Sequence, residues 1–278
     1  MGMRQPVEPI LTVELLTEIR QALLDLLDSL TDEDWQRPTV CAGWSVRDVA
    51  LHMLGDDVGL LSNMRDRDGQ YHAFEGWDGL VAFINAQNAL WVEAARRMSR
   101  RVLLDLLRFT GTQVTALFES IDPLRMGGPV GWAGDHPDPM WLHMARDLTE
   151  YWTHTQHIAD AVGQEILRDA RYLGPVLTTF AHALPHTFRA VDAPVDTLVR
   201  FQITGSWEGE WHLVREEAGW ALYARTDLSP ACTVTMDGDT AWRLFTRNQS
   251  AALLRPGIQL TGDTWLGEVT LQTVAIIA

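Results

Sequence analysis

Glu150, His154 and His157 are the residues whose types and spacing are best suited to chemistry in this 278-residue chain. They stand at positions i, i+4 and i+7, so on a helix they share one narrow face. Neutral imidazole and ionised carboxylate are the usual ligands of zinc and of divalent transition metals. Glu150 and His154 lie one helical turn apart, with Cβ atoms only about 5–6 Å from each other, and can reach the same ion. Two ligands do not make a catalytic site, so a third is needed from elsewhere in the chain.

His52 could supply that third ligand. A clearly marked helix is predicted to begin after Ser45, with Ser45 as its N-cap and Asp48 closing a capping box. His52 lies off the apolar stripe of this helix, on a face that it shares with Asp48 and Asp56. Packed beside the Glu-x3-His helix, it would complete a site of two histidines and one carboxylate. Three protein ligands leave at least one coordination position open, as in catalytic zinc sites.

Each of these residues also has an ordinary explanation. A single histidine at the edge of an apolar helix face is more often a satisfied amphipathic residue than a ligand. Glu-x3-His pairs are also common on helix surfaces. His157 fits a residue that orients a ligand better than it fits a fourth ligand, although the spacing permits either. Asp56 could replace a carboxylate ligand, but a surface aspartate is the commoner explanation, and Cys41 is interpreted as a packing residue.

Composition excludes several classes of function. The formal net charge of −15 opposes phosphate backbones and anionic lipid surfaces, so neither nucleic-acid nor membrane partners are expected. All 22 basic residues are arginine, which removes Schiff-base chemistry on lysine. Cys41 and Cys232 fit no disulfide framework, and the N-terminus has no apolar signal region. These features predict a cytoplasmic protein.

The first two thirds of the chain have helical periodicity. The pattern predicts helices over residues 13–30, 45–65, 79–97, 99–121, 139–162 and 170–191, with an irregular loop over 122–139. The helix that carries Glu150 and His154 is expected to end at Gly163. The loop is long enough to cover the mouth of a site.

From Asp192 the period changes to two. The alternation predicts strands over residues 198–203, 210–215, 220–225 and 232–236, then a helical segment over 240–246 and a short strand with a last helix over 258–277. The fold class is therefore α+β. We expect a helical domain over residues 1–191 and a smaller α+β domain over 192–278.

Two segments resemble the mycothiol-dependent maleylpyruvate isomerase family. Trp35–Met53 carries a tryptophan, a Pro-Thr-Val-Cys-Ala-Gly-Trp turn, and a helix with Val-Arg-Asp and a histidine. Leu148–Ala161 is similar to the second motif of that family, Glu-x-Trp-x-His followed by Ile-x-Asp-Ala. The resemblance implies a DinB-like four-helix bundle and, in the C-terminal part, a small sterol-carrier-like domain. It also implies a metal ion, usually zinc, held by His52, Glu150 and His154. One departure from the family matters: His157 stands where an aspartate is usual.

The leading functional hypothesis is a metal-dependent enzyme that uses a low-molecular-weight thiol, with mycothiol as the expected cosubstrate. Such an enzyme would isomerise an electrophilic small molecule or transfer the thiol sulfur to it. The loop over 122–139 and the C-terminal domain are expected to wall the pocket, and Arg225 is a candidate for binding a substrate carboxylate. The alternatives are a natural-product tailoring enzyme on the same scaffold that needs no thiol, and a non-enzymatic protein that binds a small molecule.

Overall fold

The computed structural model describes residues 3–69 and 75–275. Contacts divide the chain into two units. Leu11–Leu124 and Arg146–Leu167 form a helical unit, and the other described residues form a unit built on a β-sheet. The predicted α+β class, with a helical N-terminal region and a mixed sheet in the C-terminal region, is confirmed.

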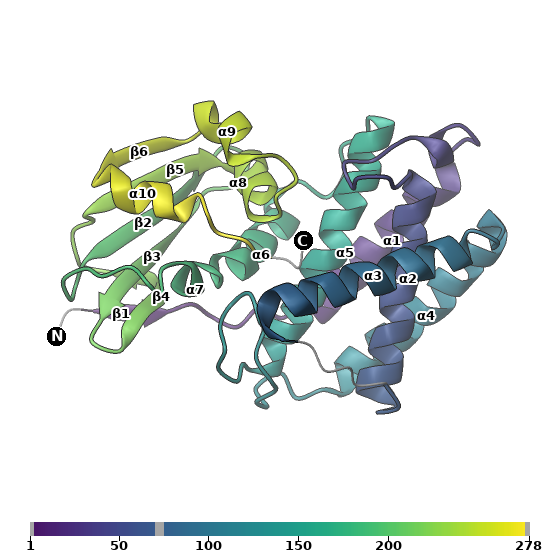
Figure 1. Ribbon diagram of the computed structural model, residues 1–278, viewed down its shortest axis with the longest axis horizontal. Coiled ribbons are helices and arrows are strands. Elements are labelled where there is room, and N and C mark those ends of the chain that lie inside the picture. Colours follow the sequence, from purple (N-terminus) through teal and green to yellow (C-terminus); the bar gives the residue numbers. More distant parts are fainter. Residues whose placement is uncertain (1–2, 70–74, 276–278) are drawn as a thin grey trace. The chain divides into compact units, whose positions relative to one another are not determined.

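The helical unit is built on a set of long helices. They are α1 (Val13–Ser29), α2 (Val46–Leu60), α3 (Gly76–Ala95), α4 (Arg100–Ser120) and, from Arg146 onward, α5 (Met140–Val162) (Figure 1). Helix α4 contacts α1 and α2, and α3 contacts α2. The apolar stripe of α1 is buried, as its helical spacing predicts, because it faces these neighbours.

Local signals fix where the helices that carry the candidate ligands begin and end. Ser45 caps α2, and its side chain and that of Asp48 exchange hydrogen bonds with each other's backbone N–H groups, so the predicted capping box is confirmed. A π-helical turn, Leu61–Arg65, follows α2. Helix α5 ends at Val162, and Gly163 follows with φ +72°, the left-handed conformation that favours glycine.

A buried ion pair links the helices of this unit. Arg20 on α1 donates to both carboxylate oxygens of Asp57 on α2, over 3.0 and 2.5 Å. Thr110 on α4 donates to the same carboxylate. The Arg20 guanidinium also lies 4.3 Å from the ring centroid of Tyr151 on α5. Asp57 is fully buried, so its charge depends on these partners.

The second unit contains a six-stranded sheet with the order β1-β4-β3-β2-β5-β6. Its strands are β1 (Arg4–Pro6), β2 (Leu198–Thr204), β3 (Gly209–Glu216), β4 (Gly219–Thr226), β5 (Cys232–Asp237) and β6 (Gln259–Gly262). Only β2 and β5 pair in parallel. Alternate residues of β2, Val199, Phe201 and Ile203, are buried, as the period of two predicts.

Helices accompany the sheet. They are α6 (Ala170–Ala181), α7 (Leu184–Thr187), α8 (Gly238–Phe245), α9 (Ala251–Leu254) and α10 (Thr264–Thr270). Of these, α7, α8 and α10 contact strands, and α6 packs against α8.

The structure corrects two expectations about this region. The single helix predicted over 170–191 is wrong, because α6 ends at Ala181 and α7 starts again at Leu184 with Pro185 in its first turn. Pro185 has no N–H group, so it cannot donate to the carbonyl of Ala181 and continue the hydrogen bonds of α6. Strand β1, which pairs with β4, was not expected, since three residues are too few to show alternation. The end of the predicted last segment, residues 276–277, lies outside the described residues.

The division into domains at residues 191 and 192 stays a prediction. Contacts group β1, Arg125–Ala145 and Arg168 onward with the sheet, so the chain passes between the two units more than once. Within the described parts of the chain, no helix has both the length and the apolar character needed to cross a bilayer.

Candidate metal centre

Three predicted ligand residues come together in the helical unit. Nε2 of His52 on α2 lies 3.1 Å from Nε2 of His154 on α5, and 3.5 Å from Oε1 of Glu150. Oε1 of Glu150 lies 2.9 Å from Nε2 of His154, its neighbour one turn along the same helix. We call His52, Glu150 and His154 the ligand cluster. Their role as metal ligands stays a prediction.

The donor atoms of the ligand cluster fit a shared cation. Around a tetrahedral zinc ion with bonds of about 2.0–2.1 Å, neighbouring ligand atoms lie roughly 3.3 Å apart, close to the spacing seen here. Two imidazole nitrogens that face each other cannot both hold a proton in the contact, whereas both can offer lone pairs to one ion. His52 and His154 are buried, so water does not easily replace the cation as a partner.

The electrostatics of the ligand cluster also suit a cation. Burial raises the pKa of Glu150, but His154 and His52 together outweigh it and hold that pKa well below its ordinary value. Burial lowers the pKa of His154 and so favours the neutral imidazole that a metal needs. Burial also lowers the pKa of His52, but the carboxylates of Asp56 and Glu150 outweigh it and raise that pKa.

Asp56 and Trp44 complete the surroundings of His52. Oδ2 of Asp56 lies 3.2 Å from Nε2 of His52, so a second carboxylate borders the ligand cluster. Burial raises the pKa of Asp56 to about 7, although 33% of its side chain stays exposed. The ring of Trp44 packs at a centroid distance of 5.1 Å from the His52 ring. The aspartate that the sequence left as an ordinary surface residue is therefore part of this environment.

His157 lies on the other edge of His154. Its Nδ1 is 3.3 Å from Nδ1 of His154 and 3.2 Å from Sγ of Cys41. His157 thus contacts His154, and its role as a residue that orients a ligand stays a prediction. Cys41, interpreted from sequence as packing, is the functional candidate that was missed. In the sequence, only its position in the first family motif marked Cys41 as a functional candidate. Its contact with His157 depends on tertiary structure, which the sequence pattern does not show.

Two further residues lie apart from the ligand cluster. His143 on α5 bonds to the carbonyl oxygen of Gly128 within the sheet unit. Arg225 is exposed on β4 in that unit. In the predicted loop, Val130 and Trp132 are buried, so part of this segment is core rather than a free covering loop.

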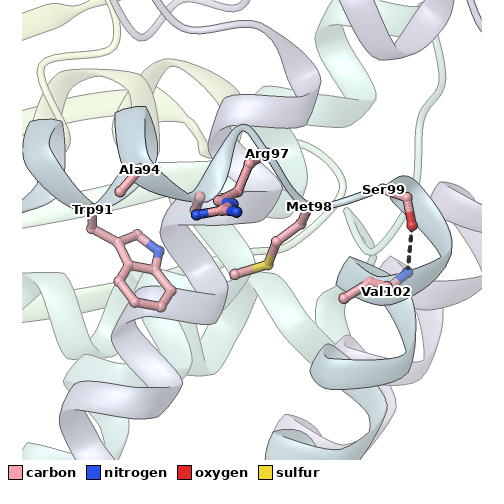
Figure 2. Close-up of a pocket in the computed structure, with 7 residues that line it drawn as sticks. Trp91, Ala94, Arg97, Met98, Ser99 and Val102 are labelled. Carbon is pink, nitrogen blue, oxygen red and sulfur yellow. Dashed lines mark hydrogen bonds between the residues drawn. The ribbon is translucent and has the colours of Figure 1, made fainter.

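A hollow of about 390 Å³ lies elsewhere on the helical unit, where α3 meets α4. Figure 2 shows Trp91, Met98 and Val102 around it, with Ser99 capping α4. None of the ligand cluster lines this hollow. Trp91, which lines this hollow, also contacts the helix of the ligand cluster. Its Nε1 donates over 2.7 Å to the carbonyl of Leu51, the residue before His52.

Fold and cluster together define a class of protein: an α+β chain whose helical unit assembles two histidines and a glutamate suited to a divalent ion. Comparison with protein families then gives a match over residues 16–159 to the mycothiol maleylpyruvate isomerase N-terminal domain. This segment is more than half of the chain and includes the whole ligand cluster, and the chain belongs to that family.

Two solved structures have the same fold at low sequence identity. The mycothiol-dependent maleylpyruvate isomerase, and a mutant of it, each match with a TM-score of 0.52 and 9% identity, covering 90% of this chain and 93% of theirs. The ubiquinone synthesis protein UbiJ-SCP2 matches 35% of this chain and 92% of its own, at 20% identity and a TM-score of 0.27. A search of curated proteins gives no match.

Proposed function

We propose that this chain is a metal-dependent enzyme that uses a low-molecular-weight thiol, mycothiol, either to isomerise an electrophilic small molecule or to form a lasting carbon–sulfur bond with it. The observation that carries the proposal is the convergence of His52 Nε2, His154 Nε2 and Glu150 Oε1 within 3.5 Å of one another. Membership of the mycothiol maleylpyruvate isomerase family supports the choice of thiol and of reaction class.

The chain's own residues would prepare the site in defined ways. His52 and His154 would each offer a ring nitrogen to the ion, and Glu150 would offer a carboxylate oxygen. Trp44 packs on His52 and His157 on His154, so both rings are held in place. A bound divalent ion, with zinc the expected one, would lower the pKa of a coordinated thiol and so favour the reactive thiolate. A cytoplasmic location, where thiols stay reduced, would suit this chemistry.

The two reaction types differ in the fate of the thiol. An isomerase returns the thiol unchanged, because the carbon–sulfur bond that forms is broken again when the double bond is restored in its new geometry. An S-transferase keeps that bond in the product and consumes one thiol per turnover. Measuring how much free thiol is consumed per product formed therefore distinguishes an isomerase from an S-transferase.

The test is a screen of the zinc-loaded protein with mycothiol against maleylpyruvate, other cis-unsaturated acids and simple electrophiles. We expect turnover that requires both metal and thiol and that is lost in His52→Ala and His154→Ala. His143→Ala is the matched control, because His143 lies on α5 like His154 but bonds outside the ligand cluster. This variant should keep activity. No turnover with any substrate would contradict the proposal. Turnover that needs metal but no thiol would favour a natural-product tailoring enzyme instead.

A further inference from the structure

His154 presents its second nitrogen to another group of metal-binding side chains. Cys41, His154 and His157 each offer one ligand atom, and these atoms lie within 4.8 Å of one another. The distance from Cys41 Sγ to His157 Nδ1 is 3.2 Å, and that between the two Nδ1 atoms is 3.3 Å. We call these three residues the thiol cluster. The ligand cluster and the thiol cluster thus share one imidazole and use its opposite nitrogens.

Cys41 is held toward this cluster by a well-defined turn. The N–H of Trp44 donates to the carbonyl of Cys41 over 2.9 Å, and the N–H of Cys41 donates to the Thr39 hydroxyl over 3.2 Å. Gly43 has φ +79°, which a residue with a side chain rarely adopts. His154 and His157 are buried, while Cys41 is only half-buried, so the thiol is the side of the cluster nearest to solvent.

Hydrogen bonding alone cannot pair all three ligand atoms of the thiol cluster. If His154 keeps the lone pair of Nε2 free for the ligand cluster, its proton sits on Nδ1 and points at Nδ1 of His157. That nitrogen has a single lone pair in the ring plane, so the thiol proton of Cys41 must point away from it. A cation would engage all three atoms, because it replaces both protons and accepts a lone pair from each atom.

We propose that Cys41, His157 and Nδ1 of His154 form a second metal site, for a thiophilic divalent cation such as zinc or cobalt, with the His154 imidazole bridging the two sites. Zinc–sulfur bonds of about 2.3 Å and zinc–nitrogen bonds of about 2.0–2.1 Å place neighbouring ligand atoms roughly 3.3–3.6 Å apart, near the two distances from Nδ1 of His157. Binding would release two protons to solvent, from the Cys41 thiol and from Nδ1 of His154. The formal net charge of −15 favours the uptake of a second cation.

The Cys41 thiol must lose its proton before its sulfur can bind a cation. Burial raises the pKa of this thiol to about 11, so without a cation it is protonated at neutral pH and is a poor nucleophile. The proposal does not depend on the thiol chemistry of the preceding section.

The test uses cobalt-loaded protein purified without any added thiol. Cobalt bound to a thiolate gives a sulfur-to-metal charge-transfer band in the near ultraviolet, and Cys41 is the only cysteine near either cluster among the described residues. We expect two cobalt ions per chain and the band in the wild type. Cys41→Ser should bind one ion and lose the band, and His157→Ala should behave in the same way. His52→Ala should keep the band, since it alters only the ligand cluster.

Cys232→Ser is the matched control, because Cys232 is buried on β5 in the other unit, and it should keep both ions and the band. A single ion per chain in the wild type would overturn the proposal. A band that survives in Cys41→Ser would overturn it as well. Circular dichroism of each variant establishes that the helices are intact before metal is added.

Discussion

At the scale of single residues, His154 joins two sets of contacts. Its Nε2 faces His52 and Glu150, and its Nδ1 faces His157. In metal sites generally, a ligand histidine has its second nitrogen fixed by another group, which sets the ring orientation. In the proposed site that group is His157, which lies beside Cys41. An aspartate is the residue that the resemblance leads us to expect at this position.

His182 gives a residue-scale prediction about pH. Burial lowers its pKa to about 4, and its ring packs edge-on against Trp141. In the unfolded chain the pKa of a histidine is about 6.5. Between pH 6.5 and 4 the unfolded state therefore binds more protons at His182 than the folded state does. The contribution of His182 to the free energy of unfolding is complete above about pH 6.5 and is lost as pH falls toward 4. A tenfold change in a protonation equilibrium is worth about 1.4 kcal/mol, so the loss is on the order of 3 kcal/mol.

Urea unfolding at several pH values tests this in the wild type and in His182→Phe, which keeps an aromatic ring beside Trp141. The variant should lose less free energy of unfolding between pH 6.5 and 4 than the wild type. Parallel pH profiles for the two proteins would show that His182 does not titrate in this way.

At the scale of elements, the close approach of Trp91 on α3 restricts which side chains α2 can carry at position 55. A Cβ atom built on Gly55 would lie 2.7 Å from the Trp91 ring, whereas one built on Gly59 of the same helix meets nothing within 4 Å. Alanine normally stabilises a helix interior by about 0.5–1 kcal/mol relative to glycine. Gly59→Ala should therefore raise the free energy of unfolding by about this amount. Gly55→Ala should lower it, because the indole is held by its bond to Leu51.

Thermal or urea unfolding of the two variants measures the difference directly. The pair is its own control, since both substitutions are the same and lie one turn apart on one helix. Equal stabilisation by both would mean that Trp91 moves away without cost.

The buried Arg20–Asp57 pair carries a second element-scale prediction. Asp57→Ala would leave the guanidinium of Arg20 buried without its carboxylate, at a cost of about 3–5 kcal/mol. Arg20→Met with Asp57→Leu should recover much of that loss, because the pair is replaced by apolar side chains of similar size. If Asp57→Ala cost less than about 1 kcal/mol in urea unfolding, the pair would not be holding α1, α2 and α4 together.

The elements show what could be predicted from sequence. The capping box at Ser45 and the glycine that follows the end of α5, Gly163, depend on local chemistry, and both were predicted. The break between α6 and α7 was missed because apolar spacing continues across Pro185. The contact of Cys41 with His157 was missed for another reason: it needs a turn and a distant helix to pack together, which no local pattern encodes.

At the scale of the whole molecule, the chain passes between its two units, yet every residue of both clusters belongs to the helical unit. A ligand that binds only the folded state stabilises the part of the structure that holds it. We therefore expect zinc to slow amide hydrogen exchange in α2 and in residues 146–162 of α5. Exchange in β2, β3 and β5 of the sheet unit should change much less. Equal slowing throughout both units would contradict a metal site confined to the helical unit.

The central claim is that the ligand cluster holds an ion that coordinates a thiol. The most direct test is to titrate mycothiol into cobalt-loaded Cys41→Ser protein, in which the thiol of Cys41 is absent. The account predicts a new sulfur-to-cobalt charge-transfer band that saturates at one mycothiol per chain and does not form when His52 is also replaced by alanine. A spectrum that mycothiol leaves unchanged, in protein with cobalt bound, would contradict it.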